Sequence, residues 1–162
     1  MSDVEEEIGV LLKEKRLSLG IVESATGGLI SHLITNVPGS SDYYKGSITA
    51  YSNSTKIKLV GVSEATIQRY GAVSHQVAEE LARGGRRVLE SDICLSDTGI
   101  AGPSGATAEK PVGLFYLGLS HGDNILSKKH LFQEGRAGNK KAAAEAALGW
   151  LKKYLKDLQV NR

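Results

Sequence analysis

Short apolar runs of the kind that form β-strands alternate with longer amphipathic segments along this chain. Alternation of this kind is typical of α/β folds, in which helices cover both faces of one sheet. Two strand-like runs at 112–120 and 124–132 follow each other across a short turn, which indicates an antiparallel hairpin. We therefore predict one three-layer α/β/α domain over residues 1–162, with a mixed, mostly parallel sheet.

Periodicity and turn residues place the expected elements along the chain. Apolar residues repeat at helical spacing from Val4, and Gly20 is a suitable helix end, so we predict a first helix between them. Ser74 is a suitable N-cap for a longer helix that ends near Leu89. Further helices are expected at 29–36, 53–60, 63–70 and in the C-terminal segment, and strands at 20–23, 46–52 and 93–95 besides the hairpin.

The composition fits a single folded domain outside the membrane. Hydrophobic residues make up 41% of the 162 residues, which is enough for one continuous core. The first residues, MSDVEEEIG, are acidic and do not resemble a secretory signal. No apolar run approaches the ~18 residues of a transmembrane helix. We therefore expect a soluble, cytoplasmic protein without a membrane partner.

Charge and ligand-type residues give little support for nucleic-acid or metal binding. The 20 basic and 18 acidic residues leave a net charge of only +2, so we expect no nucleic-acid partner. The histidines His32, His75, His121 and His130 do not have the spacing of metal ligands, and we expect no metal site. Cys94 stands alone in an apolar run and is expected to be a core residue.

A long glycine- and proline-rich segment, TGIAGPSGATAEKPVG at 98–113, directly follows an expected strand. In α/β folds, ligands bind in the crevice beyond the carboxyl ends of the strands. A long loop without regular structure in a small domain is usually functional. The glycines at 99, 102 and 105 match neither the dinucleotide nor the P-loop pattern. The segment therefore predicts a binding loop, but not a nucleoside-triphosphate site.

The segment ESATGG at 23–28 lies where an expected strand passes into a helix. One interpretation is that Thr26 caps the helix while Gly27 and Gly28 allow close packing. The other is that free amide groups at the helix start bind an anion. The residues themselves leave both interpretations open.

The segment PGSSDYYKGSITAYSNSTK at 38–56 contains a serine and a lysine that suggest nucleophilic chemistry. A serine hydroxyl becomes a nucleophile when a base takes its proton, and a neutral lysine is such a base in Ser–Lys hydrolases. Ser41 precedes the expected strand and Lys56 follows it, so they lie at opposite ends unless the chain folds back. Tyr51 is placed to orient or relay a proton. The residues alone favour the simpler interpretation of a Pro-Gly turn and a surface lysine.

Six blocks taken together resemble the C-terminal domain family of competence/damage-inducible protein CinA. They are ESATGG, NVPGSSDYY, AYSNSTKIKLVGV, YGAVSHQVAEELA, SDTGIAGPSGATAEKPVG and EGRAGNK, and the resemblance extends from about residue 5 to 157. The family includes nicotinamide mononucleotide deamidases, which are Ser/Lys amidohydrolases. The resemblance thus implies a three-layer fold and hydrolysis of the carboxamide of nicotinamide mononucleotide to nicotinic acid mononucleotide and ammonia. It implies no metal and no organic cofactor.

By motif position, the resemblance places the nucleophile on Ser41, the general base on Lys56 and an assisting hydroxyl on Tyr51. Thr98 and Arg136 match further active-site positions. Backbone amides around Ser40 and Ser41, or the Thr98 hydroxyl, are candidate donors to the oxyanion. For the substrate phosphate we favour Arg136 and the glycine loop over ESATGG. The candidate substrate-binding residues are Ser40, Thr98, Gly99, Gly102, Arg136, Thr26 and Gly27.

The chain departs from the family pattern in ways that leave a second function open. Ala25 stands where the family usually has cysteine in ESCTGG, so no thiol acts there. Some family proteins carry a large N-terminal domain associated with pyrophosphatase activity, which we do not expect of this chain. The alternative function is a catalytically silent nucleotide-binding or regulatory module of the same fold. A homo-oligomer, dimeric or larger, is expected in either case.

Overall fold

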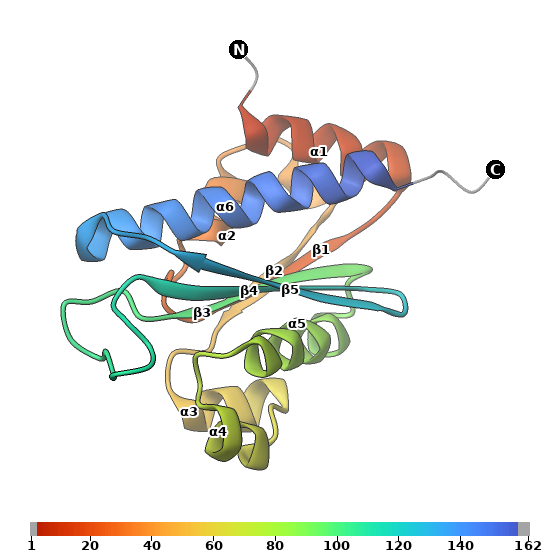
Figure 1. Ribbon diagram of the computed structural model, residues 1–162. Coiled ribbons are helices and arrows are strands. Elements are labelled where there is room, and N and C mark those ends of the chain that lie inside the picture. Colours follow the sequence, from red (N-terminus) through yellow and green to blue (C-terminus); the bar gives the residue numbers. More distant parts are fainter. Residues whose placement is uncertain (1–2, 159–162) are drawn as a thin grey trace.

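The computed structural model describes residues 3–158 and contains one mixed, five-stranded sheet (Figure 1). The strands are β1 (Leu19–Glu23), β2 (Tyr44–Thr49), β3 (Ile93–Gly99), β4 (Leu114–His121) and β5 (Asn124–Leu131), in the order β2-β1-β3-β4-β5. β1 pairs in parallel with β2 and β3, whereas β4 is antiparallel to both β3 and β5. Four strands thus run in one direction and β4 runs against them, which confirms the mixed, mostly parallel sheet.

Helices cover both faces of this sheet, as the alternating pattern predicts. They are α1 (Val4–Lys15), α2 (Leu29–Thr35), α3 (Asn53–Thr55), α4 (Glu64–Tyr70), α5 (His75–Leu89) and α6 (Gly135–Asp157), with a 3₁₀ turn η1 (Ser40–Asp42) and a π turn η2 (Lys56–Val60). α1, α2 and α6 lie on one face, and α5, α3 and α4 lie on the other (Figure 1). None of the helices within residues 3–158 has both the length and the apolar character needed to cross a membrane.

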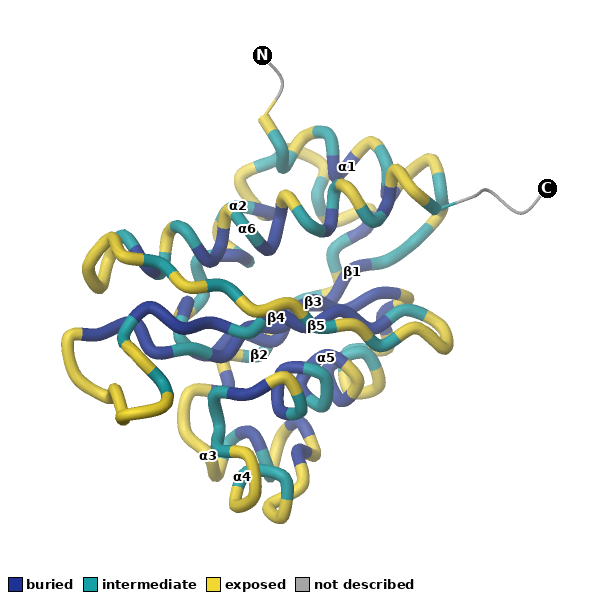
Figure 2. Tube along the Cα trace, viewed as in Figure 1, coloured by how far each residue is buried: buried dark blue, intermediate teal, exposed yellow. Residues whose placement is uncertain are grey.

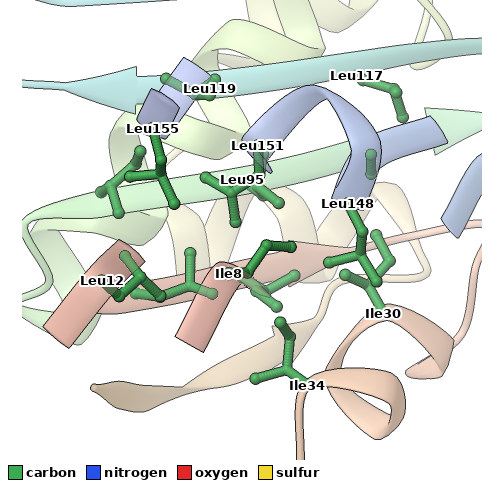
Figure 3. Packing of buried hydrophobic residues seen from close by; sticks show 14 of the residues in the cluster. Ile8, Leu12, Ile30, Ile34, Leu95, Leu117, Leu119, Leu148, Leu151 and Leu155 are labelled. Atoms are coloured by element: carbon green, nitrogen blue, oxygen red, sulfur yellow. The ribbon is translucent and has the colours of Figure 1, made fainter. Parts of the chain in front are cut away.

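The larger part of the core lies between the sheet and the layer of α1, α2 and α6. Side chains from all three helices meet those of the central strands there (Figure 3). Those labelled in the figure are Ile8, Leu12, Ile30, Ile34, Leu95, Leu117, Leu119, Leu148, Leu151 and Leu155, and each is at most 1% exposed. Burial of each such side chain contributes about 1.5–3 kcal/mol, so this layer holds α1 and α6 against the sheet.

A second, smaller cluster lies under α5 on the opposite face. Val22, Val77 and Leu81 are fully buried in it together with Cys94. Burial raises the pKa of the Cys94 thiol to about 12, so the thiol stays protonated and behaves as a small apolar group. The expectation of a core cysteine is confirmed. Figure 2 shows that the central strands are mostly buried and that the helices on both faces of the sheet carry buried as well as exposed residues.

The first helix is shorter than the sequence predicts. α1 ends at Lys15, and Arg16 terminates it in the left-handed conformation, with a φ of 56°. Gly20 is instead a fully buried residue of β1. A Cβ atom there would lie 2.7 Å from Ser91 Oγ and 2.9 Å from Leu89 Cδ1. The glycine is thus explained by the close approach of neighbouring side chains rather than by a helix end.

The central strand β3 is longer than its apolar run at 93–95 suggests. It continues through Ser96, Asp97 and Thr98, all of which are at most 1% exposed. Polar side chains are buried at low cost only when they are hydrogen-bonded, and these are. Ser96 Oγ donates to Ala78 O at 2.6 Å, and Thr98 Oγ1 donates to Ala72 O at 2.8 Å. Partners distant in sequence thus extend the strand beyond its apolar run.

The surroundings of two helical glycines, Gly84 and Gly149, predict opposite changes in stability when each is replaced by alanine. A Cβ atom on Gly84 in α5 would lie 2.1 Å from Val60 O, a backbone atom, so we expect Gly84→Ala to destabilise the protein by about 1–3 kcal/mol. A Cβ atom on Gly149 in α6 would have no neighbour within 4 Å. We therefore expect Gly149→Ala to stabilise the protein by about 0.5–1 kcal/mol through helix propensity. Urea unfolding of both variants measures the difference, and changes of the same sign would contradict this packing.

Candidate active site

A pocket of about 320 Å³ opens beyond the carboxyl ends of β1 and β3. The chain continues from β1 to β2 on one side and from β3 to β4 on the other, and such a divergence creates a crevice between two strand ends. Figure 1 shows the long loop after β3 projecting at this edge, near the start of α6. The lining residues are Ser24, Ala25, Tyr51, Asn53, Lys56, Ala72, Val73, Thr98, Gly99, Ile100, Ala101, Gly102, Ser104, Gly105 and Arg136.

Lys56 and Ser24 form a hydrogen-bonded pair in this pocket. Lys56 is only 2% exposed, and its Nζ atom lies 3.0 Å from Ser24 Oγ. Nζ also donates to the carbonyl oxygen of Tyr51, at 3.0 Å. Ser24 follows β1 directly, whereas Lys56 begins the η2 turn, which follows the short α3 helix capped by Ser52. Two segments 32 residues apart in sequence thus place an amine against a hydroxyl.

The surroundings of Lys56 favour its neutral form. Burial lowers the pKa of the Lys56 ammonium, because removal from water penalises the charged form. The carboxyl group of Asp97 acts in the opposite direction and raises the pKa of Lys56. A lysine that loses its proton more readily than a surface lysine is suited to act as a base.

Glu23 takes the place of an external anion at the start of α2. Its carboxylate accepts hydrogen bonds from the backbone amides of Ile30 at 2.8 Å and Ser31 at 3.0 Å. The hydroxyl of Ser31 donates to the same carboxylate at 2.6 Å. These amides are the groups that an anion at ESATGG would need. The cap predicted at Thr26 is thus corrected to Glu23, whose carboxylate occupies the α2 amides that an external anion would use.

Thr26 and Asp97 fix the turn that carries Ser24. The Asp97 carboxyl accepts from the backbone amides of Ser24 at 2.9 Å and Thr26 at 3.2 Å, and contacts Thr26 Oγ1 at 2.5 Å. Burial, supported by the neighbouring Glu23, raises the pKa of Asp97 to about 6, although the hydrogen bonds from Thr26 and Ser24 lower it. A fully buried carboxyl group therefore lies directly beneath the serine.

Ala25, which is one of the residues that line the pocket, has a backbone amide without a hydrogen-bond partner in residues 3–158. The amides on either side of it, those of Ser24 and Thr26, both donate to Asp97. Among the hydrogen bonds of residues 3–158, none is donated by the amide of Ala25. Because Ala25 lines the pocket next to Ser24, this amide is available to a bound ligand.

The structure does not bring Ser41 to Lys56. Ser41 lies in η1, which precedes β2, and its side chain is exposed at the amino end of the strand. Lys56 lies beyond the carboxyl end, and the six residues of β2 alone span ~20 Å at ~3.3 Å per residue. Ser40 lies in the same turn, and neither serine lines the pocket. The sequence-based pairing of Ser41 with Lys56 is corrected to the pairing of Ser24 with Lys56.

The other predicted residues divide between the pocket and its surroundings. Tyr51, Thr98, Gly99, Gly102 and Arg136 all line the pocket. Tyr51 is 62% exposed, and its hydroxyl lies 3.4 Å from Arg136 Nη2. Its contact with Lys56 is made by the backbone carbonyl group of Tyr51. The hydroxyl of Thr98 is engaged with a backbone carbonyl, so its proton is not free for an oxyanion. Arg136 Nη1 donates to Gly102 O at 2.8 Å, which holds the guanidinium at the loop.

Thr26 and Gly27 lie outside this pocket. Thr26 is 1% exposed and its hydroxyl is held between two carboxyl groups. Gly27 lines a separate hollow beside Lys140 on α6. The prediction that these two residues bind the substrate is therefore not supported by their placement.

Two residues that complete the site, Ser24 and Asp97, were not predicted as site residues from the sequence. Ser24 was discoverable, because a hydroxyl directly after a buried strand and before a helix lies at the edge where α/β folds bind ligands. Asp97 gave no such signal, because its partners are 71 and 73 residues away. In the described part of the chain, no group of three or more His, Cys, Asp or Glu residues is placed to hold a metal ion.

Comparison with known proteins identifies relatives over nearly the whole chain. The family model of the CinA C-terminal domain matches residues 1–155. A putative competence-damage inducible protein of Halothermothrix orenii is 48% identical over 152 residues, which is 93% of this chain and 37% of that protein. A CinA-like protein of Salinibacter ruber is 46% identical over 145 residues, 90% of this chain and 35% of that protein. The chain thus spans little more than a third of these relatives.

Solved structures share the same fold. The competence/damage inducible protein CihA from Agrobacterium tumefaciens is 33% identical, with a TM-score of 0.88 over 97% of this chain and 98% of that one. The competence damage-inducible protein A from Klebsiella pneumoniae has a TM-score of 0.93 at 22% identity, over 96% of this chain and 97% of that one, and supports the fold alone.

Proposed function

The chain belongs to the CinA C-terminal domain family, and we propose that it is an amidohydrolase that acts on the carboxamide of nicotinamide mononucleotide. The products are nicotinic acid mononucleotide and ammonia. The observation that carries the proposal is the 3.0 Å contact between Lys56 Nζ and Ser24 Oγ, which is buried yet lines a pocket. The family resemblance supplies the substrate class, and the pair supplies the chemistry.

The contacts of Lys56 suit a base that acts on Ser24. In its neutral form the amine has two hydrogens and one lone pair. One hydrogen donates to the carbonyl of Tyr51, which leaves the lone pair free to accept the proton of the Ser24 hydroxyl. Burial lowers the pKa of Lys56 and thereby raises the fraction of this neutral form. The second hydrogen is available to the leaving group.

The proposed reaction has two stages. Ser24 Oγ attacks the carboxamide carbon while its proton moves to Lys56 Nζ, and a tetrahedral intermediate forms. Lys56 then gives this proton to the amide nitrogen, the C–N bond breaks, ammonia leaves and an acyl-serine remains. Water next attacks the acyl carbon and transfers a proton to Lys56. Collapse of the second intermediate releases the acid and returns that proton to Ser24.

The backbone amide of Ala25 is the proposed donor to the tetrahedral oxyanion. It belongs to the residue after the nucleophile, a position that also supplies an oxyanion donor in α/β-hydrolases. Asp97 orients the turn by holding the two flanking amides. A preorganised donor of this kind contributes about 2.7–4 kcal/mol to catalysis in other hydrolases. The donor predicted at Ser40 and Ser41 is thereby replaced.

Arg136 is the proposed partner of the substrate phosphate. Its guanidinium is fixed by Gly102 O and the Tyr51 hydroxyl at the rim of the pocket. Arginine is suited to this task because its planar fork binds phosphate through two hydrogen bonds. The pocket volume lies at the lower end of the ~300–1,000 Å³ typical of small-ligand sites. A mononucleotide is thus a reasonable occupant.

Ammonia release from the purified protein tests the function directly. Nicotinamide mononucleotide, nicotinamide riboside, the dinucleotide and free nicotinamide are each incubated with it. We expect the mononucleotide to be hydrolysed fastest and the riboside to show a raised KM, because it lacks the phosphate that meets Arg136.

The same assay decides between the enzyme and the silent binding module. Binding of the mononucleotide by calorimetry with no ammonia release would contradict the enzyme and support the module. Preference for the riboside or for free nicotinamide would contradict the phosphate role of Arg136 but retain the amidase chemistry.

A further inference from the structure

Two buried carboxyl groups meet at one hydroxyl beneath the proposed nucleophile. Thr26 Oγ1 lies 2.7 Å from Glu23 Oε1 and 2.5 Å from Asp97 Oδ1. A hydroxyl group has a single hydrogen, so it can donate to only one of these oxygens. Both contacts are hydrogen bonds only if one carboxyl group carries a proton and donates it to Thr26. The geometry therefore requires one proton in addition to that of the hydroxyl.

The hydrogen bonds of Glu23 indicate which carboxyl group takes this proton. Glu23 Oε1 accepts from the Ile30 amide and faces the Thr26 hydroxyl, and Oε2 accepts from the amide and the hydroxyl of Ser31. Four donors thus fill the four acceptor positions of this carboxylate. Asp97 receives only two backbone amides besides the Thr26 contact, and its Oδ1 atom has the shorter contact to that hydroxyl. The extra proton is therefore best placed on Asp97.

The charged groups that face Asp97 are few. β1 contributes Glu23, and η2 contributes Lys56. β4 places Leu117 opposite Asp97, and the buried residues of α5 and α6 are all uncharged. A charge on Asp97 is therefore poorly screened and acts mainly on Glu23 and Lys56.

We propose that Glu23, Thr26 and Asp97 share one proton, and that Asp97 acts through it as a positioning residue for Lys56. The proposal rests on the role of Lys56 as the base. When Asp97 is ionised, its charge stabilises the ammonium that forms as Lys56 takes the proton of Ser24. When Asp97 holds the shared proton, that support is absent and Lys56 accepts a proton less readily.

The raised pKa of Asp97, about 6, sets the pH at which this exchange occurs. Below this pH Asp97 is protonated and uncharged. Burial then acts on Lys56 without an opposing charge, and it lowers the pKa of the lysine. Above this pH the ionised carboxylate raises the pKa of Lys56 again. The two groups are thus coupled, and each reports the titration of the other.

Carboxyl and lysine side-chain NMR on the full chain tests the proposal without requiring turnover. In the wild type, we expect the Asp97 carboxyl signal to titrate near pH 6 and the Lys56 Cε signal to show a step at the same pH. In Asp97→Asn this step disappears and Lys56 titrates at lower pH. Asp42→Asn changes an exposed aspartate paired with Lys13 and should leave both titrations unchanged.

Thr26→Val provides a second variant if Asp97→Asn does not fold. It removes the hydroxyl that bridges Glu23 and Asp97 and keeps both carboxyl groups, so we expect the Asp97 and Lys56 steps to shift together away from their wild-type pH. An Asp97 signal that titrates with the exposed aspartates would overturn the proposal, as would a Lys56 titration unaffected by Asp97→Asn. Failure of the wild type to release ammonia would reject the amidase function, while these titrations would still decide the shared proton.

Discussion

Ser24→Ala is expected to lower the rate of nicotinamide mononucleotide hydrolysis by at least ~10³-fold, mainly through kcat. The substitution removes the only side-chain hydroxyl that contacts Lys56 Nζ among residues 3–158. Without the Oγ atom there is no acyl-serine, and only direct attack of water remains. Substrate binding should persist, because Arg136 and the loop after β3 are unchanged. Ammonia release under saturating substrate, together with calorimetric binding, measures both effects.

Ser41→Ala is the matched control for this experiment. Ser41 is an exposed serine in the η1 turn at the opposite end of β2, so the same loss of a hydroxyl should leave the rate within about twofold of the wild type. If Ser41→Ala abolished activity while Ser24→Ala retained it, the proposed site would be wrong. Circular dichroism of both variants excludes unfolding as the cause of any loss.

The contrast between these serines shows how far the sequence can locate a site. The order of strands and helices predicts an α/β sheet, and ligands in such sheets bind beyond the carboxyl ends of parallel strands. Ser24 follows β1 and satisfies this rule, whereas Ser41 precedes β2 and does not. The family resemblance assigned the nucleophile to Ser41, although the order of residues already placed Ser41 and Lys56 at opposite ends of the expected strand. Placement relative to the strand ends was the better guide.

Other parts of the site depend on contacts that no local pattern contains. Lys56 is followed by the apolar and basic run IKLV, which resembles any exposed helical turn, yet its amine is buried. Its burial depends on the return of the chain after β2 toward the end of β1. In the sequence alone, Asp97 likewise resembles an ordinary polar residue at the end of an apolar strand. Its role as a buried acceptor for the Ser24 turn emerges only when β1 and β3 pair in parallel.

Lys56→Met is expected to abolish amide hydrolysis, with a loss of at least ~10³-fold, and at the same time to preserve or raise stability at neutral pH. Methionine retains the length of the side chain but has no amine, so Ser24 loses its base. Burial of Lys56 lowers the folding stability of the wild type, because removal from water disfavours the charged ammonium and lowers the pKa of this lysine. The carbonyl of Tyr51 and the hydroxyl of Ser24 lose a partner, but both face a pocket that water can enter.

The pH dependence of stability distinguishes this explanation from a simple packing effect. Because the folded-state pKa of Lys56 is lowered, the unfolded chain binds more protons than the folded one between that pKa and the ordinary value of 10.5. The stability of the wild type relative to Lys56→Met should therefore rise with pH through this window and stay constant at its lower value at pH values below the window. Lys58→Met, which removes an amine at an exposed position of the same turn, is the matched control and should retain activity. Equal behaviour of the two variants in urea unfolding across this pH range would show that Lys56 is not held in the folded protein as a readily deprotonated amine.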